Sequence, residues 1–417
     1  MFFEFINYKG DAGMEQNIIE RPVYTQRIVP FIGKGLIKVL TGQRRVGKSC
    51  VLIQCRDHIL NNDKKANIIF INMEDMAFRA LRTDEALYEY IRKHLKKGKN
   101  NYLFIDEVQN VSGFENVLRS FAANSECDIF VTGSNAKMLS GDLATYLAGR
   151  YVEFRIDPLS YGEFLLFHNL TNTDESLLKY LEFGGMPQLA GMPLSRDFSF
   201  NYLRDVYSTI LLKDVIEREK VRDTVFLENL SFFLADNIGS IFSANSIAEY
   251  LKAQRVAVTN SVVLNHLRSL CNAFIVNKVR RYDIQGKKIF ETNDKYYFSD
   301  TGIRNCIGGL DMTKDIGKLA ENAVYNHLLR NRFEIFVGKN KDREIDFYCR
   351  KVDKKIYVQV AFRIQDEKTY EREFGNLLAI KDNYPKYVVS MDPLLPESDS
   401  SGISFCPLRN FLLKEEF

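Results

Sequence analysis

The sequence predicts an α/β fold that begins with a parallel β-sheet and continues into helical and mixed domains. From about residue 34 to residue 157, apolar runs of strand length alternate with stretches of helical periodicity, as in right-handed βαβ crossovers. Several of these apolar runs end in polar residues. Because parallel strands present their carboxyl ends at one edge of the sheet, we expect these polar residues to share that edge.

A loop of phosphate-binding type directly follows the first strand, 36–40. Its residues are Gly42, Gln43, Arg44, Arg45, Val46, Gly47, Lys48 and Ser49, with Cys50 next. They match the pattern GxxxxGK[ST], whose glycines let successive N–H groups point at one anion. We expect the loop and the following helix N-terminus to bind ATP or ADP, with Lys48 reaching the outer phosphates and Ser49 binding Mg²⁺. The alternative is a glycine-containing turn that matches by chance.

A buried-type strand, 102–105, ends in the acids Asp106 and Glu107. In a site of this kind we expect Asp106 to hold the Mg²⁺ shell and Glu107 to polarise the attacking water as a general base. Two solvated acids at a strand end are the alternative interpretation. Next to the phosphate-binding loop, the catalytic interpretation is favoured.

The strand 128–133 leads into small polar residues, Ser134 and Asn135. At the carboxyl edge these groups would face a bound γ-phosphate, so Asn135 is predicted to be a sensor. Arg150 follows a helical segment and precedes the strand 151–154. It either stabilises the transferring phosphate or pairs with an acid at a helix end, and both interpretations stay open.

These motifs resemble the AAA+ superfamily, and more narrowly the prokaryotic AAA-plus-DUF4143 ATPases related to archaeal and STAND-type ATPases. The narrower resemblance rests on the loop 42–49 and on the segments 132–134, 147–150, 158–164 and 183–187. It implies that Pro187 lies near the adenine. It also implies that Arg150 acts as an arginine finger toward a neighbouring subunit, so a homo-oligomer is a candidate assembly.

Composition limits the other classes of function. A chain of 417 residues suggests two or three domains, and a net charge of +3 is too small to indicate polyanion binding by the whole chain. The seven cysteines show no CxxC spacing, so neither a disulfide framework nor a zinc site is expected. The sequence has no apolar run of about 18 residues and no secretory leader. We therefore expect a cytoplasmic protein without membrane partners, starting at Met1 or Met14.

Five regions are predicted: an N-terminal segment (1–33), the ATPase core (34–157), a helical lid (158–237), a winged helix (238–305) and a restriction-nuclease-like α+β domain (306–417). In the winged helix, Ser246 is expected to cap one helix. The strand 274–282 is expected to pair with 289–292. The cations of this hairpin either bind DNA phosphates or protect a solvated edge; they include Arg280, Arg281, Lys287 and Lys288.

The resemblance to restriction nucleases implies metal-binding acids at Glu321 and Asp346. The third element reads Gln359-Val360-Ala361, so the usual acid and lysine are absent and the domain is expected to be degenerate. The leading hypothesis is therefore an Mg²⁺-dependent ATPase whose nucleotide state controls conformation or assembly. The alternatives are a nucleotide-gated DNA-binding regulator with slow hydrolysis and a DNA-processing nuclease.

Overall fold

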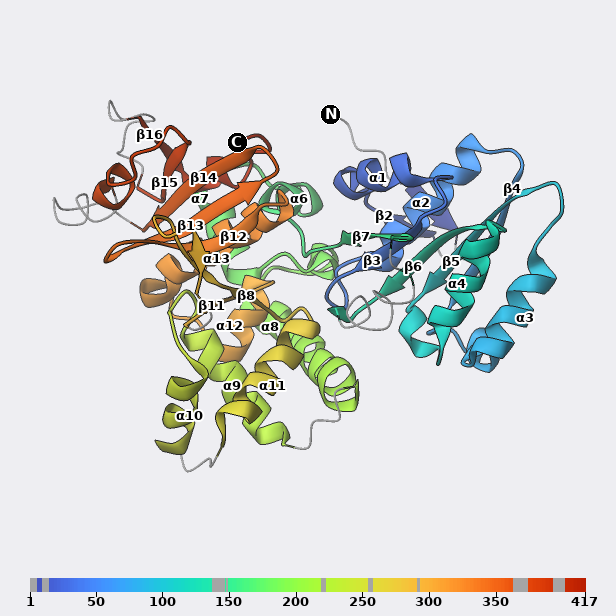
Figure 1. Cartoon of the computed structure of the whole chain (residues 1–417), viewed down its shortest axis with the longest axis horizontal. Helices are drawn as coiled ribbons and strands as arrows, with labels where there is room; N and C mark the ends of the chain where they lie inside the picture. The colour runs from blue at the N-terminus through green and yellow to red at the C-terminus, as the bar shows by residue number, and fades with distance from the viewer. Residues whose placement is uncertain are drawn as a thin grey trace. The chain divides into compact units, whose positions relative to one another are not determined.

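The structure is a computed structural model that describes residues 6–9, 15–136, 147, 149–218, 223–253, 258–290, 293–362, 374–392 and 402–417 of the chain. The described chain divides into two compact units (Figure 1). The N-terminal unit comprises Met1–Asp157 with Asn272–Phe274. The C-terminal unit comprises Pro158–Cys271 with Ile275–Phe417.

The N-terminal unit is built on a parallel sheet whose described strands, five in number, have the order β4-β5-β6-β3-β7. The strands are β3 (Ile37–Thr41), β4 (Ala66–Asn72), β5 (Asn100–Asp106), β6 (Asp128–Gly133) and β7 (Tyr151–Arg155). The helical elements are α1 (Pro22–Ile28), η1 (Val29–Phe31), α2 (Lys48–Asn62), η2 (Met76–Leu81), α3 (Asp84–His94), η3 (Val108–Asn110) and α4 (Phe114–Asn124). The predicted α/β class is confirmed. Strands β1 (Ile6–Lys9) and β2 (Glu15–Ile18) form a separate antiparallel pair.

Both faces of this parallel sheet are buried, which explains why its strands read as continuous apolar runs. Aliphatic side chains from β3, β4, β5 and β6 form a core with residues of α3 and α4 on one face. On the other face the rings of Phe70, Phe104 and Phe130 are stacked, with centroid distances of 6.0 and 4.6 Å. The crossovers can be followed in Figure 1.

The register of the sheet places the polar strand ends at one edge. Leu40 pairs with Thr132, and Thr41 pairs with Gly133. On the neighbouring strands, Ile105 pairs with Val131. The loop after β3 therefore begins at the same level as the acids after β5 and the small polar residues after β6.

The C-terminal unit begins with helices. They are α6 (Tyr161–Phe167), α7 (Asp174–Phe183), η5 (Pro187–Gly191), α8 (Arg196–Thr209), the π-helical continuation η6 (Ile210–Glu217), α9 (Thr224–Asp236), α10 (Ala244–Ala253), α11 (Asn260–Asn272), α12 (Thr301–Gly308) and α13 (Met312–Arg330). The predicted cap at Ser246 is wrong. Helix α10 begins at Ala244, and the hydroxyl of Ser243 accepts a hydrogen bond from the Ser246 N–H at 3.1 Å. Ser243 therefore caps the first turn.

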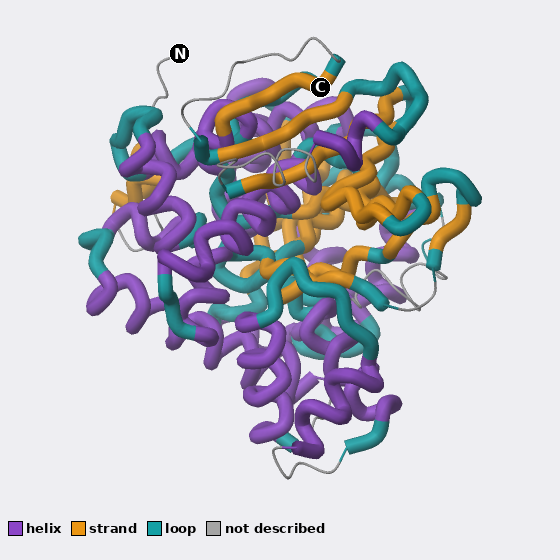
Figure 2. The backbone as a smooth tube through the Cα atoms, turned by 90° about the vertical axis from the view of Figure 1, so that its left-hand side faces the viewer, coloured by secondary structure: helices purple, strands orange, loops and turns teal. Residues whose placement is uncertain are grey.

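A mixed sheet follows, whose described strands, seven in number, have the order β10-β9-β12-β13-β14-β15-β16. The strands are β9 (Arg281–Asp283), β10 (Lys288–Ile289), β12 (Glu334–Asn340), β13 (Arg343–Lys351), β14 (Lys354–Ala361), β15 (Lys386–Ser390) and β16 (Ile403–Pro407), and the short helix α15 (Leu408–Phe411) follows. The parallel run of β14, β15 and β16 can be followed in Figure 2.

The predicted hairpin is correct only at its turn. Asp283 pairs with Lys288, but β8 (Val276–Val279) pairs with β11 (Lys295–Phe298). The next strand, β9, does not continue the β8–β11 pair, because it pairs in parallel with β12 of the mixed sheet. The hairpin is therefore an edge of that sheet, and the winged-helix assignment stays a prediction. Within the described ranges, no helix has the length and apolar character needed to cross a bilayer.

One buried histidine makes the C-terminal unit sensitive to acid. His327 on α13 is buried against Phe411, and its Nε2–H donates to the carbonyl of Lys414 at 2.9 Å. Burial, aided by the charge of Arg330, lowers the pKa of His327 to about 3. Since this pKa lies below that of an unfolded histidine, the neutral form stabilises the fold. Stability is present above about pH 6.5 and falls as the pH drops toward 3.

We predict that His327→Gln, which keeps an N–H donor, flattens the acid limb of the stability curve. The free energy of unfolding should be measured in urea between pH 7 and pH 4. The parent should lose up to about 1.4 kcal/mol more per pH unit than the variant. His94→Gln, at an exposed site on α3, is the control. Equal slopes for the parent and His327→Gln would contradict the prediction.

Candidate nucleotide-binding site

The loop between β3 and α2 has a backbone that its glycines make possible. Gly42 has φ 143° and Gly47 has φ 91°, and a Cβ on Gly42 would lie 2.1 Å from the carbonyl oxygen of Ile156. Arg45 also has a positive φ, 69°. Glycine is needed at position 42 both for its φ and for this close approach. The loop therefore curls tightly before the N-terminus of α2.

Lys48 begins α2 and is 4% exposed. Its ammonium donates to the carbonyl oxygens of Gly42 and Gln43 at 3.1 and 3.0 Å. It also lies 3.7 Å from Oε1 of Glu107. The lysine thus spans the loop and reaches the acids that follow β5, as the sequence pattern requires.

Asp106 ends β5 and is buried. Burial raises the pKa of its carboxyl, and this effect exceeds the lowering of the pKa by the hydroxyls of Thr132 and Ser49. Ser49, in the first turn of α2, therefore lies beside Asp106. A hydroxyl and a carboxylate are ligands that suit Mg²⁺, which keeps several waters in such sites.

Glu107 is held in the left-handed region, with φ 54°. Its N–H donates to the hydroxyl of Thr132 at 2.9 Å. Its carboxylate accepts hydrogen bonds from Ser134 at 3.2 Å and from the amide of Gln109. Non-glycine residues with left-handed backbone angles are strained, so they persist only where surrounding contacts hold them. They are common at functional sites. Asn135, the predicted sensor, is buried next to Ser134.

Arg21 supports the loop from outside the motif and was not predicted as a site residue. Its guanidinium is buried and donates to the carbonyl oxygens of Val46 at 2.8 Å and Asp157 at 3.0 Å. The ring of Tyr24 lies 4.6 Å away. Arg21 thus fixes the loop to the chain that leaves β7. Thr132 and Gln109 were also missed as partners of the two acids.

The side chain of Gln43 supports a polar ligand at this loop. It is 1% exposed, and neither amide atom has a hydrogen-bond partner among the described residues. An unpaired buried amide costs about 1–3 kcal/mol, and such groups call for an explanation such as a bound ligand or water. Together with the close approach at Gly42, this observation fits a loop shaped to hold phosphate.

The other predicted site residues lie in varied surroundings. Arg44 pairs with Glu74 at 2.9 Å. Cys50 is partly buried on α2, and burial raises the pKa of its thiol, so it stays neutral. Arg150 is exposed, and its carbonyl accepts a hydrogen bond from the N–H of Ile37 at 2.9 Å. Residues 137–146 and 148 of the preceding segment lie outside the described residues.

Pro187 belongs to the C-terminal unit, where it begins η5. Its predicted contact with adenine therefore stays a prediction.

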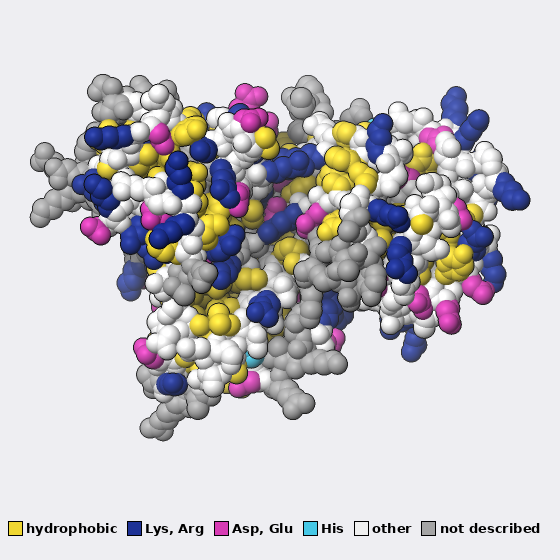
Figure 3. All heavy atoms as spheres, in the orientation of Figure 1, with side chains coloured by type: hydrophobic (Ala, Val, Ile, Leu, Met, Phe, Trp, Pro, Cys, Tyr) yellow, Lys and Arg dark blue, Asp and Glu magenta, His cyan; other side chains and the backbone are white. Residues whose placement is uncertain are grey.

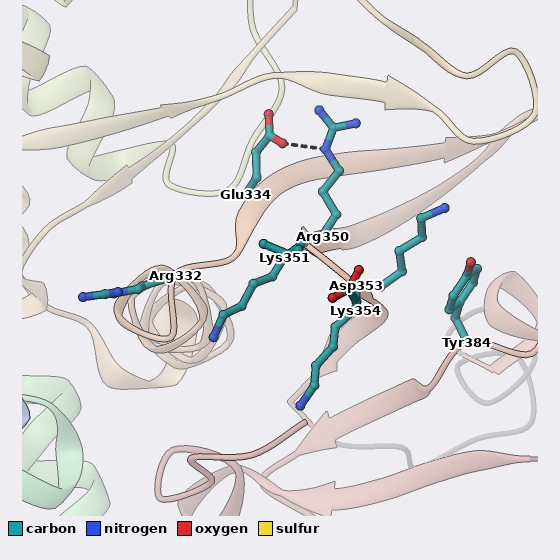
Figure 4. A pocket seen from close by; sticks show the side chains of 9 residues that line it. Arg332, Glu334, Arg350, Lys351, Asp353, Lys354 and Tyr384 are labelled. Carbon is teal, nitrogen blue, oxygen red and sulfur yellow. Dashed lines mark hydrogen bonds and ion pairs between the residues drawn. The ribbon is translucent and has the colours of Figure 1, made fainter. Parts of the chain in front are cut away.

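The surface of the C-terminal unit carries many cations (Figure 3). On the β9–β10 hairpin and just before it, Arg280, Lys287 and Lys288 are exposed, whereas the guanidinium of Arg281 lies 5.1 Å from the ring centre of Phe290. A separate hollow at the β13–β14 hairpin is lined by five cations and two acids. Their side chains point in different directions, and Arg350 pairs with Glu334 at 2.5 Å (Figure 4). This hollow does not converge on one anion.

The parallel sheet and the loop after β3 have the arrangement of a P-loop domain, and comparison with known proteins finds an AAA domain in this part of the chain. Residues 34–165 match the family model described as an AAA domain. Residues 174–314 match a domain of unknown function, DUF8612, whereas the predicted DUF4143 region is not shown.

Two relatives cover most of the chain. An uncharacterised protein of Haemophilus influenzae is 37% identical over 409 residues, which are 96% of this chain and 100% of the relative. The uncharacterised protein MJ1544 of Methanocaldococcus jannaschii is 31% identical over 398 residues, 92% of this chain and 86% of the relative. The chain belongs to the same family as these two proteins.

Solved structures resemble the chain only weakly. The Orc1 protein of Aeropyrum pernix in complex with DNA is 12% identical, with a TM-score of 0.31 over 69% of this chain and 92% of that chain. AMPPCP-bound DnaA of Aquifex aeolicus is 16% identical, with a TM-score of 0.32 over 59% of this chain and 86% of that chain. A likeness this weak carries no inference about function.

We predict that Arg21→Gln loosens the loop and weakens nucleotide binding. The shorter neutral amide cannot bridge both carbonyl groups, and hydrogen bonds from a charged donor contribute about 1.5–3 kcal/mol. ATP affinity, measured by calorimetry, should fall roughly tenfold, and the melting temperature should also fall. Lys34→Gln, at an exposed site on the same unit, is the control. Unchanged affinity in Arg21→Gln would show that the loop keeps its shape without the arginine.

Proposed function

We propose that this protein binds ATP with Mg²⁺ and hydrolyses the γ-phosphate, and that its nucleotide state controls conformation or assembly. The observation that carries the proposal is the convergence of Lys48, Asp106 and Glu107 at the end of the phosphate-binding loop. Lys48 is 3.7 Å from Glu107, and Ser49 lies beside Asp106 and favours its charged form. This is the set of groups that phosphoryl transfer needs: a loop for the phosphates, a cation, a metal-binding pair and a base.

Each residue has a separate task in this proposal. The loop 42–49 and Lys48 bind the phosphates. Ser49 and Asp106 hold Mg²⁺, which would neutralise charge on the phosphate oxygens. Glu107 accepts the proton of the attacking water, and its contacts with Ser134 and Gln109 keep the carboxylate in position. Asn135 is proposed to sense the γ-phosphate from the end of β6.

We predict that Lys48→Ala and Glu107→Gln separate binding from turnover. Lys48→Ala should abolish ATP binding because the cation that reaches the phosphates is lost. Glu107→Gln should still bind ATP but hydrolyse it about 10²–10⁴ times more slowly, because the general base is lost. Calorimetry and phosphate release would measure the two effects.

Glu89→Gln, at an exposed site on α3, is the control for the loss of a carboxylate. Turnover by Glu107→Gln at the parental rate would remove Glu107 from the role of base. If the parent itself does not release phosphate from ATP, the hydrolytic proposal fails as a whole.

We also propose that Arg150 acts on the site of a neighbouring subunit. Its exposed position just before β7 supports this proposal, although a structural role is the alternative. Mixing Arg150→Ala with Glu107→Gln should then restore some ATP turnover, because each variant supplies what the other lacks. Mixed assemblies should be verified by mass measurement. No recovery in verified mixtures would assign Arg150 to its own subunit.

DNA binding with slow hydrolysis is a second candidate function. The exposed cations Arg280, Lys287 and Lys288 favour it. The two candidates differ in one measurement: for a DNA-binding regulator, duplex DNA should bind with strong salt dependence while ATP turnover stays slow. The cytoplasmic location stays a prediction from the sequence.

A further inference from the structure

A buried lysine lies among carboxylates in the C-terminal unit. Lys295 begins β11 and is 3% exposed. Its ammonium lies 3.1 Å from Glu321 Oε1, 2.9 Å from Glu344 Oε1 and 3.8 Å from Asp346 Oδ1. The carboxylates come from α13 and β13, so the lysine joins three elements that are distant in sequence.

Further hydrogen bonds orient these carboxylates. The hydroxyl of Tyr297 donates to Glu321 at 2.6 Å, and the N–H of Val360 donates to Asp346 at 2.8 Å. The amide oxygen of Gln359 accepts from the N–H of Asp346 at 3.3 Å. Carboxylate and amide oxygens are the ligands of hard divalent cations. In this protein, however, an ammonium group lies at their centre.

The charges keep this ammonium in place. Three carboxylates within 4 Å of the ammonium offset the cost of burying Lys295 and favour its charged form. The group is therefore charged at neutral pH. A metal ion bound by the same carboxylates would lie within a few ångströms of a second positive charge, which strongly disfavours binding. Across the described ranges, no group of His, Cys, Asp and Glu is arranged to hold a metal ion.

We propose that Lys295 is a built-in cation that takes the place of a divalent metal ion in this carboxylate cluster and closes it to metals. The cluster is then a structural joint between the β8–β11 pair, α13 and the mixed sheet. Glu321 and Asp346, for which the sequence resemblance implies a nuclease-like metal site, serve this joint. Sequence reasoning missed Lys295 and Glu344.

The test uses full-length Lys295→Met, which keeps the length of the side chain and removes the charge. In EDTA its melting temperature should fall by roughly 5–10 °C, because the carboxylates lose their counter-charge. Added Mn²⁺ should restore much of this loss by binding the opened cluster. The parent, free of nucleotide, should show no such recovery. Lys278→Met, on the paired strand β8, should respond like the parent; among the described residues the ion-pair partner of Lys278 is Asp294.

Mn²⁺ titration followed by electron paramagnetic resonance tests the parent directly and does not depend on the folding of Lys295→Met. We expect the parent to have no Mn²⁺ site with a dissociation constant below about 1 mM that is lost in Asp346→Asn. Micromolar binding that disappears in Asp346→Asn would overturn the proposal. DNA cleavage in Mg²⁺ or Mn²⁺ that is lost in Asp346→Ala but kept in Lys48→Ala would also overturn it. If Lys295→Met folds but gains no response to Mn²⁺, the cluster is not a metal-type site and the proposal fails.

Discussion

The parallel register of β3, β5 and β6 is the constraint on which the candidate site depends. It sets Leu40 opposite Thr132 and Ile105 opposite Val131, so the loop, the acids and the small polar residues emerge together. The hydroxyl group of Thr132 then contacts both acids. It accepts a hydrogen bond from the N–H of Glu107 and donates one to the carboxyl of Asp106. A shift of one residue in β6 would turn Thr132 to the opposite face of the sheet and remove both contacts.

The parts of this site that depend on local spacing were accessible from the sequence. The loop 42–49 is one continuous segment, and its chemistry follows from where glycine, lysine and serine stand within it. The strand ends at Asp106 and Ser134 follow from apolar runs and from the shared edge of a parallel sheet. Arg21 could not be found in this way. Its partners, Val46 and Asp157, are 25 and 136 residues away, and no periodicity links these positions.

The same distinction explains the errors in the C-terminal unit. The α+β character of residues 306–417 was predicted, because α13 and the strands β12, β13 and β14 each have their own periodicity. The pairing of 276–279 was misjudged because turn chemistry favoured the nearest apolar run, while β11 lies only slightly further along the chain. Ser243 and Ser246 are both reasonable caps from composition alone, and only the position of the first helical turn distinguishes them. Lys295 belongs to a cluster that forms only after α13 and β13 have packed.

The buried carboxylates of the two units are held by different kinds of neighbouring groups. In the C-terminal unit the ammonium of Lys295 contacts the acids directly, so part of their charge is balanced within the chain. In the N-terminal unit Asp106 is held by hydroxyl groups, and burial still raises its pKa. The folded chain therefore leaves this carboxyl in surroundings that disfavour its charge, a cost that an added divalent cation would reduce. The ammonium of Lys295 lies among its carboxylates, whereas Lys48 donates to carbonyl oxygens of the loop and lies 3.7 Å from Glu107. On this physical ground we expect the carboxylates of the N-terminal unit, rather than those around Lys295, to be available to a metal ion that enters with nucleotide.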